Sequence, residues 1–370
     1  MKKKFRLPLS CAAAAAFAAL LTLFSGKAQA AAVTGLTLCL ETIIPSLFPF
    51  FVMSSLIVSS GLSQAVASAA GRLMPIAFGV SGNGALPLIL GFTGGYPVGA
   101  KTVAELYQSG AIDKKEAGRL LVFTSNTGPA FIFGAAGAAV FKSPPAGAIL
   151  YISHILSALI IGGGCRLLFG SAVTSPQKKL SPPAASGGFI SAVTGSFASV
   201  LNVCAFVVIF SVFTGLSDSL GVTSAICAAL SRLGADPVKC RMIITGFFEI
   251  SSGIAALRDV SADLAFALPA ASFIISWGGL SVHLQAMSFV SESGLPMGGY
   301  FIGKLCHGLL SAGLTWFFTV FSGIQPVFAF TGHETAKSFI FDYIGLFYSA
   351  ACILAGLIVL LLTHLKSHRQ

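Results

Sequence analysis

Apolar segments with almost no charge follow one another through this chain, and they limit it to folds that suit a lipid bilayer. A helix needs about 20 such residues to cross the hydrocarbon core. Only 9% of the residues are charged, whereas a soluble domain has about a quarter. Segments near the required length lie at residues 7–25, 33–60, 117–141, 144–170, 189–217, 265–290, 297–323 and 340–364. We therefore predict an all-α polytopic membrane protein with about eight transmembrane helices.

The charge pattern argues against other classes of protein. The net charge is +10, but the basic residues cluster at the ends of apolar segments, as the positive-inside rule expects. No nucleotide-binding GxxxxGK[ST], metalloprotease HExxH or hydrolase GxSxG motif is present, so no enzyme activity is predicted. The predicted partners are the lipid bilayer and a small-molecule substrate, without nucleic acid, metal or cofactor. A coupling Na⁺ or H⁺ and a homo-oligomer are left open.

Glycine, proline and charge interrupt two further apolar stretches, at residues 64–100 and 219–257. Each is predicted to form a re-entrant hairpin. A Ser/Pro/Lys/Gly-rich segment between them divides the chain almost in half. The predicted organisation is an uncleaved, signal-peptide-like first helix at 1–32, a repeat at 33–170, a cytoplasmic linker at 171–188, a second repeat at 189–325, and a last helix with a basic tail at 326–370.

The two halves echo each other in the order of their motifs. Residues 91–99 correspond weakly to 246–253, and residues 125–129 to 276–280. When crossings are counted from a cytoplasmic N-terminus, the basic loop 101–119 falls inside and its counterpart falls outside. An inverted-topology repeat is therefore predicted. Broken helices in inverted repeats are typical of transporters, with the substrate site near the middle of the bilayer.

A helix that is interrupted inside the membrane exposes backbone N–H or C=O groups that can bind a polar ligand. The glycines and Pro97 predict one such break within 91–101, and residues 126–129 predict another. The alternative is that these glycines only permit close helix packing. The candidate substrate-binding residues are Gly94, Gly95, Tyr96, Pro97, Lys101, Ser125, Asn126, Thr127, Gly128, Glu249, Ser251, Ser252, Gly278, Gly279, Ser281 and His283.

Glu249 is the most informative of these residues, because a carboxylate at membrane depth is costly and is by default a functional hypothesis. It could bind a coupling cation, carry a proton or contact the substrate. The alternative is a structural carboxyl group that accepts hydrogen bonds from backbone N–H groups of its hairpin. For His283 the alternative to a ligand-binding role is that of a packing residue with satisfied hydrogen bonds. Lys304 and His307 are expected to snorkel or to lie in an interior seam.

Five motifs, in order, resemble the sporulation integral membrane protein YlbJ family within the nucleoside recognition (Gate) group. They are Pro45-Ser46-Leu47-Phe48-Pro49-Phe50-Phe51, Gly94-Gly95-Tyr96-Pro97-Val98-Gly99-Ala100-Lys101, Ser125-Asn126-Thr127-Gly128-Pro129, Phe248-Glu249-Ile250-Ser251-Ser252-Gly253 and Trp277-Gly278-Gly279-Leu280-Ser281-Val282-His283. The resemblance implies a transporter whose two re-entrant hairpins and adjacent broken helices hold the ligand.

The resemblance also suggests a substrate. The acidic hairpin motif of nucleoside transporters is not matched in the first half, while the sporulation branch is associated with moving dipicolinic acid. An anion would suit helix N-termini and the nearby Lys101. The expected function is transport of a small anionic solute, dipicolinate, by alternating access in the bacterial cell membrane or the mother-cell-derived outer forespore membrane. A nucleoside carrier and a non-transporting scaffold for cortex assembly are the alternatives.

Overall fold

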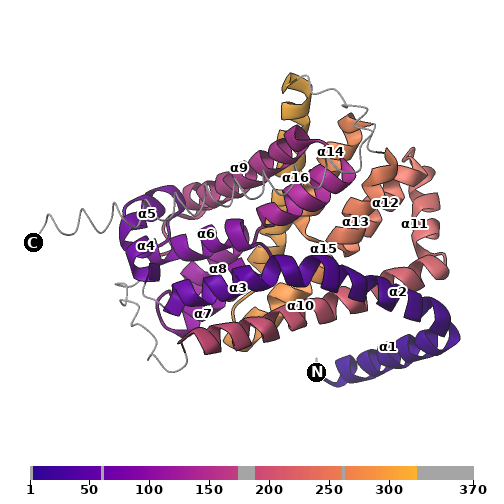
Figure 1. Ribbon diagram of the computed structural model, residues 1–370, viewed down its shortest axis with the longest axis horizontal. Coiled ribbons are helices and arrows are strands. Elements are labelled where there is room, and N and C mark those ends of the chain that lie inside the picture. The colour runs from indigo at the N-terminus through magenta and orange to yellow at the C-terminus, as the bar shows by residue number, and fades with distance from the viewer. Residues whose placement is uncertain (1–2, 60–61, 174–187, 261–262, 323–370) are drawn as a thin grey trace, which may run out of the picture.

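The computed structural model describes residues 3–59, 62–173, 188–260 and 263–322, and throughout these ranges the chain is helical without a strand (Figure 1). The prediction of an all-α membrane protein is confirmed. The predicted last helix at 340–364 and most of the predicted linker lie outside the described residues.

Twelve elements build the first half: nine α-helices, α1 to α9, two π-helices, η1 and η3, and one 3-10 turn, η2. They are α1 (Lys3–Leu23), α2 (Ser25–Leu38), η1 (Cys39–Ile43), α3 (Ile44–Ser59), α4 (Leu62–Ala70), α5 (Leu73–Phe78), η2 (Gly82–Gly84), α6 (Ala85–Gly94), α7 (Val98–Gln108), α8 (Lys114–Phe123), η3 (Ala130–Val140) and α9 (Pro144–Phe169).

The second half consists of α10 to α16 with two short 3-10 segments. They are α10 (Gly188–Ser219), α11 (Val222–Ser231), α12 (Pro237–Phe248), α13 (Ile250–Ala256), η4 (Leu257–Val260), α14 (Leu264–Trp277), α15 (Gly279–Val290), η5 (Ser291–Ser293) and α16 (Gly298–Ser322). Both halves contain the same order of five elements, α6, α7, α8, η3 and α9 in the first and α12 to α16 in the second. A break separates the first element from the second, another break separates the third from the fourth, and the fifth is a long helix.

By length and composition, four helical segments of the described chain can cross a membrane. They are Pro144–Phe169, Gly188–Ser219, Leu264–Val290 and Gly298–Phe321. A fifth is possible if α1 and α2, which meet at 98°, form one bent span. The span 117–141, predicted with a break at 126–129, consists of two pieces, α8 and η3, because residues 124–128 are not helical. The predicted span 33–60 begins earlier, in the helical stretch that starts at Ser25.

Local sequence explains where several helices begin. The Asp113 carboxylate accepts a hydrogen bond from the backbone N–H of Glu116 at the start of α8. Ser143 caps α9 in the same way, followed by proline in the first turn, and Asp236 caps α12. Short polar side chains at these positions satisfy N–H groups that have no partner within the helix.

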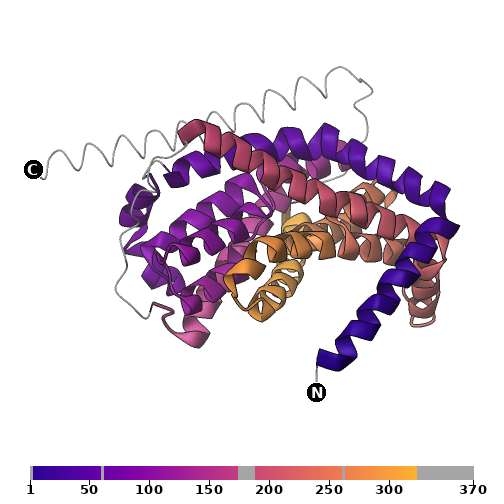
Figure 2. The same cartoon turned by 90° about the horizontal axis from the view of Figure 1, so that it is seen from below.

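Long helices frame the short ones. α2 and α3 follow each other end to end through η1, and α10 packs along both of them in the two views (Figures 1 and 2). α16 packs against α14, α9 and α8, so it contacts elements of both halves. The broken helices are thereby held in the interior between these long helices.

Candidate functional site

In the first half, the break between α6 and α7 packs directly on the break after α8. A Cβ atom on Gly91 or on Gly99 would collide with the carbonyl oxygen of Thr124. Gly95, at φ 80°, would bring a Cβ within 2.7 Å of the backbone nitrogen of Gly128. Backbone approaches backbone here at distances that leave no room for a side chain. The predicted breaks at 91–101 and 126–129 are therefore confirmed, and they touch each other.

The second half repeats this arrangement. Glu249 separates α12 from α13, and Gly278, at φ 88°, separates α14 from α15. A Cβ on Gly279 would lie 3.1 Å from the backbone nitrogen of Ile250. Each half therefore contributes one hairpin break that packs on a mid-helix break.

Side chains from the first half then contact the broken helix of the second. The Tyr96 hydroxyl donates to the carbonyl of Ser276 at 3.1 Å, and the Thr127 hydroxyl donates to the carbonyl of Ile275 at 2.8 Å. These carbonyls lie in the last turn of α14, where acceptors have no partner within the helix. The break at Gly278 leaves these two carbonyl groups without a partner in their own helix, and hydroxyl groups of the first half donate to them.

His154, in the middle of α9, links the breaks of both halves and was not predicted as a site residue. Its Nε2 accepts a hydrogen bond from the backbone N–H of Thr127 at 3.0 Å, so this nitrogen carries no proton. In the neutral ring, Nδ1 then donates to Ser276 Oγ at 2.7 Å. The side chain is fully buried. An ionisable residue in an apolar span was the sequence signal that could have identified it.

Replacing His154 with leucine is expected to destabilise the protein by about 1–3 kcal/mol, because the backbone N–H of Thr127 loses its buried acceptor. His154→Gln, which retains an acceptor, should lose less. The measurement is the thermal unfolding temperature of each variant in detergent. Equal unfolding temperatures for wild type and His154→Leu would show that the link contributes nothing to stability.

Lys304 and His307 lie on one face of α16, one turn apart, and both are buried. Lys304 Nζ donates to the carbonyl of Ser125 at 2.8 Å and to His307 Nδ1 at 2.9 Å. It also lies 4.9 Å from the centre of the Tyr96 ring. His307 Nε2 donates to the carbonyl of His154 at 2.9 Å. Of the two placements expected for this pair, snorkelling or an interior seam, the structure shows the interior seam.

No carboxylate forms an ion pair with Lys304 within the described residues. The ion pairs found there are Lys101–Glu105, Lys239–Asp263 and Arg241–Asp218. A buried cation without a counter-ion is costly. Lys304 is therefore a buried basic group whose charged form would lack a counter-ion among the described residues.

Glu249 lies at the start of α13 and is 1% exposed. Its carboxylate accepts hydrogen bonds from the backbone N–H groups of Ser251 at 2.9 Å and Ser252 at 2.6 Å. These bonds are the ones that the structural interpretation of Glu249 requires. They also mean that the N-terminus of α13 already has an anion, the Glu249 side chain itself.

Two other predicted residues have different surroundings. Lys101 Nζ donates to Ser199 Oγ of α10 at 3.0 Å and lies 3.9 Å from Glu105 Oε1 of α7. These partners belong to α7 and α10, and neither of them lies at one of the four helix breaks. His283 accepts from or donates to the Tyr300 hydroxyl at 3.0 Å, while its ring packs edge-on against Trp277.

Several predicted residues carry buried polar atoms without a hydrogen-bond partner. Among the described residues eight such side-chain atoms are found, and four belong to predicted site residues: Ser125 Oγ, Asn126 Oδ1, Ser281 Oγ and His283 Nε2. Buried polar groups are normally paired. A concentration of unpaired ones near the breaks indicates a place where a polar ligand or water would gain hydrogen bonds.

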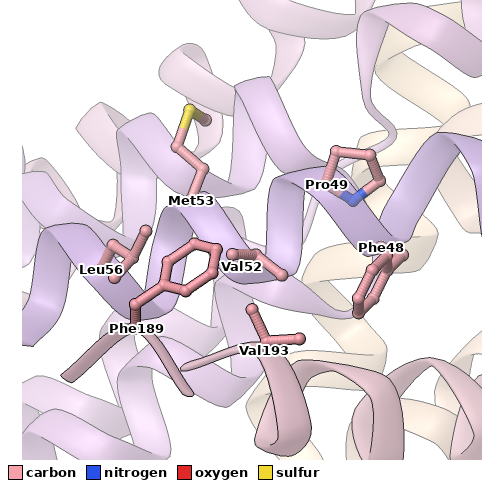
Figure 3. Close-up of a pocket in the computed structure, with 7 residues that line it drawn as sticks. All are labelled: Phe48, Pro49, Val52, Met53, Leu56, Phe189 and Val193. Carbon is pink, nitrogen blue, oxygen red and sulfur yellow. The ribbon is translucent and has the colours of Figure 1, made fainter. Parts of the chain in front are cut away.

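An apolar pocket of ≈ 520 Å³ lies elsewhere, between α3 and the start of α10 (Figure 3). Figure 3 shows its lining residues, Phe48, Pro49, Val52, Met53, Leu56, Phe189 and Val193, none of which is a predicted site residue. Its lining has no charged or polar side chain. It does not have the chemistry to select a polar solute.

These features define a class: a polytopic helical membrane protein whose broken helices meet in the interior, as in transporters. Residues 40–144 match the family described as Nucleoside recognition, named Gate. The chain is 29% identical over 303 residues to the sporulation integral membrane protein YlbJ of Bacillus subtilis (strain 168). The matched region covers 75% of this chain and 74% of that protein. No solved structure matches the chain.

The two matches confirm the resemblance that the sequence motifs predicted. The Gate match covers the first hairpin break and the break after α8, and so includes the candidate residues from Gly94 to Gly128. The protein is a helical membrane protein that is similar to a sporulation integral membrane protein and, over residues 40–144, to the Gate family.

Proposed function

We propose that this protein moves a small anionic solute, with dipicolinic acid as the candidate substrate, across a bacterial cell membrane during sporulation. The observation that supports this most is the buried amino group of Lys304, which lies at the meeting point of the breaks and has no carboxylate partner in the described chain. A bound anion would supply the missing counter-charge. The sporulation setting comes from the relative's name.

The surroundings of Lys304 suit an aromatic dicarboxylate. Ser125 presents an unpaired hydroxyl on the same residue whose carbonyl accepts from Lys304. The neighbouring Asn126 side chain is buried as well. The Tyr96 ring offers an aromatic surface against which a pyridine ring can pack. Charge, hydrogen-bond donors and an aromatic face are the three things that recognition of dipicolinate requires.

Transport by alternating access requires the two halves to move relative to each other around this site. Few polar contacts join the breaks across the halves, chiefly those of Tyr96, Thr127 and His154 with the last turn of α14. Each such bond contributes about 1 kcal/mol net. Contacts of this size can break and reform during a transport cycle.

A nucleoside or nucleobase carrier is the second candidate, because the matching family is described as Nucleoside recognition. The unpaired Asn126 Oδ1 favours it, since an amide oxygen can accept from a base. A neutral nucleoside would not stabilise the protonated form of Lys304, whereas an anion would, and for this reason dipicolinate is preferred. A membrane scaffold without transport would need no such cluster.

Liposomes that contain the purified protein are expected to take up dipicolinate saturably, without competition from uridine. Glu249→Gln should lower uptake about tenfold, because the amide loses one charge-assisted bond to the start of α13, worth ~1.5 kcal/mol. Asp218→Asn, at an exposed ion pair, is the matched control and should leave uptake unchanged.

Uridine uptake, or competition by uridine, would favour the nucleoside carrier. Absence of flux for both compounds, with folded and inserted protein, would favour the scaffold. Flux that Glu249→Gln leaves unchanged would mean that the charge of Glu249 at the start of α13 does not contribute to transport.

A further inference from the structure

We infer that Lys304 and His307 form a proton-carrying pair that takes up one proton with each anion and releases it with the anion, so that transport is proton-coupled. The inference rests on the proposed function. It assigns the coupling ion, and it gives the coupling role to a lysine–histidine pair on α16 rather than to the acidic Glu249.

The hydrogen bonds fix which nitrogens hold protons. The carbonyl of His154 can only accept, so His307 Nε2 carries a hydrogen, and Nδ1 of the neutral ring is an acceptor. Lys304 must then donate to Nδ1. Its other partner, the carbonyl of Ser125, also only accepts. Lys304 therefore donates two hydrogen bonds and accepts none.

A neutral lysine amine has two N–H bonds, which is the number that these contacts use. The ammonium form would have a third N–H and a full charge, and no carboxylate forms an ion pair with it in the described chain. Lysine loses its proton readily when buried without a partner. The two hydrogen bonds of Lys304 thus fit an amine that lacks its third proton.

Within the described residues, no charged side chain is in contact with Lys304. α14 contains no titratable residue, although it packs closely on α16. α9 presents the neutral ring of His154, and the α6–α7 connection presents Tyr96. α15 contributes His283 and α16 itself contributes Tyr300. Of the charged residues of α8, Glu116 accepts from the backbone of Ser81, while Lys115 and Arg119 donate to the carbonyls of Ser171 and Gly170.

The cycle is balanced in protons. When the site opens to one side, the anion enters, and the amine of Lys304 takes a proton from water to become an ammonium ion beside it. His307 Nδ1 can share this proton across the 2.9 Å contact. When the site opens to the other side, the anion leaves and the ammonium returns the proton to water. The pair stays neutral when empty, which removes the cost of an unpaired buried charge.

The test is calorimetric binding of dipicolinate to the detergent-solubilised wild-type chain, in buffers of different ionisation enthalpy and at several pH values. We expect about one proton taken up per dipicolinate, with an apparent Kd that rises about tenfold per pH unit on the alkaline side. Lys304→Arg, whose guanidinium keeps its charge, should show neither proton uptake nor pH dependence. Lys239→Arg, at an ion pair outside the site, is the matched control and should retain both.

Each outcome separates the two claims. Dipicolinate binding by the wild type without proton uptake would overturn the inference and leave the proposed function intact. Absence of binding at every pH would overturn the proposed function. Proton uptake that persists in Lys304→Arg would move the coupling to another group. If Lys304→Arg does not fold, wild-type liposomes decide: an acidic exterior should accelerate dipicolinate uptake at least fivefold, and an unchanged rate would refute coupling.

Discussion

Gly99→Ala is expected to prevent the chain from accumulating as a folded protein. The new Cβ would collide with the carbonyl oxygen of Thr124, and a backbone atom cannot move aside as a flexible side chain can. Relieving the clash would separate α7 from the break after α8, where Gly95 and Gly128 are also in contact. Overpacking of this kind costs about 3 kcal/mol or more. Yield and monodispersity in detergent, measured by size-exclusion chromatography, are the readouts.

Gly164→Ala in α9 is the control for this substitution. A Cβ on Gly164 meets nothing within 4 Å, so alanine should be tolerated and should slightly favour the helix. A monodisperse Gly99→Ala protein with wild-type thermal stability would show that the two breaks do not pack as closely as described.

Lys304→Met is expected to abolish dipicolinate uptake while leaving the protein as stable as wild type or more stable. Methionine fills a similar volume and removes a buried basic group that has no ion-pair partner in the described chain, a change that is often neutral or stabilising. The carbonyl of Ser125 loses a donor, which offsets part of the gain. Uptake should fall about 100-fold, as expected for loss of a charge-assisted contact worth ~3 kcal/mol.

The measurements are the thermal unfolding temperature in detergent and the initial rate of uptake into liposomes. Lys239→Met, at a partly exposed ion pair, is the matched control and should transport normally. A Lys304→Met protein that transports dipicolinate at the wild-type rate would remove Lys304 from the site. One that unfolds would show that Lys304 is structural.

The sequence predicted the breaks better than it predicted the spans. Glycines with proline at 94–97, and the polar run at 125–128, are local signals that a helix cannot continue, and the chain is interrupted at both places. Hydropathy alone marks 117–141 as one apolar span, because it averages over the polar residues at its centre, whereas residues 126–129 predicted the break that the structure shows. The membrane orientation of the two halves remains a prediction.

The candidate residues were predicted unevenly for a similar reason. Tyr96 and Thr127 lie beside recognisable breaks, and both contact the opposite half. His154 and Lys304 lie within regular helices, where nothing local marks a site beyond an ionisable residue in an apolar segment. Lys304 and His307 were noticed for this reason but could not be assigned partners.

By itself the sequence determined that the chain is a helical membrane protein, that its helices break at two kinds of place in each half, and that an acidic residue, Glu249, lies at one break. Those properties follow from hydropathy and from the backbone preferences of glycine and proline, which act over a few residues. Only the tertiary structure showed that the carbonyl of Ser125 is the partner of Lys304, 179 positions away, and that His154 bridges the halves. Pairing across such distances depends on how the helices pack, because an exposed acceptor at a break takes its donor from whichever helix lies against it.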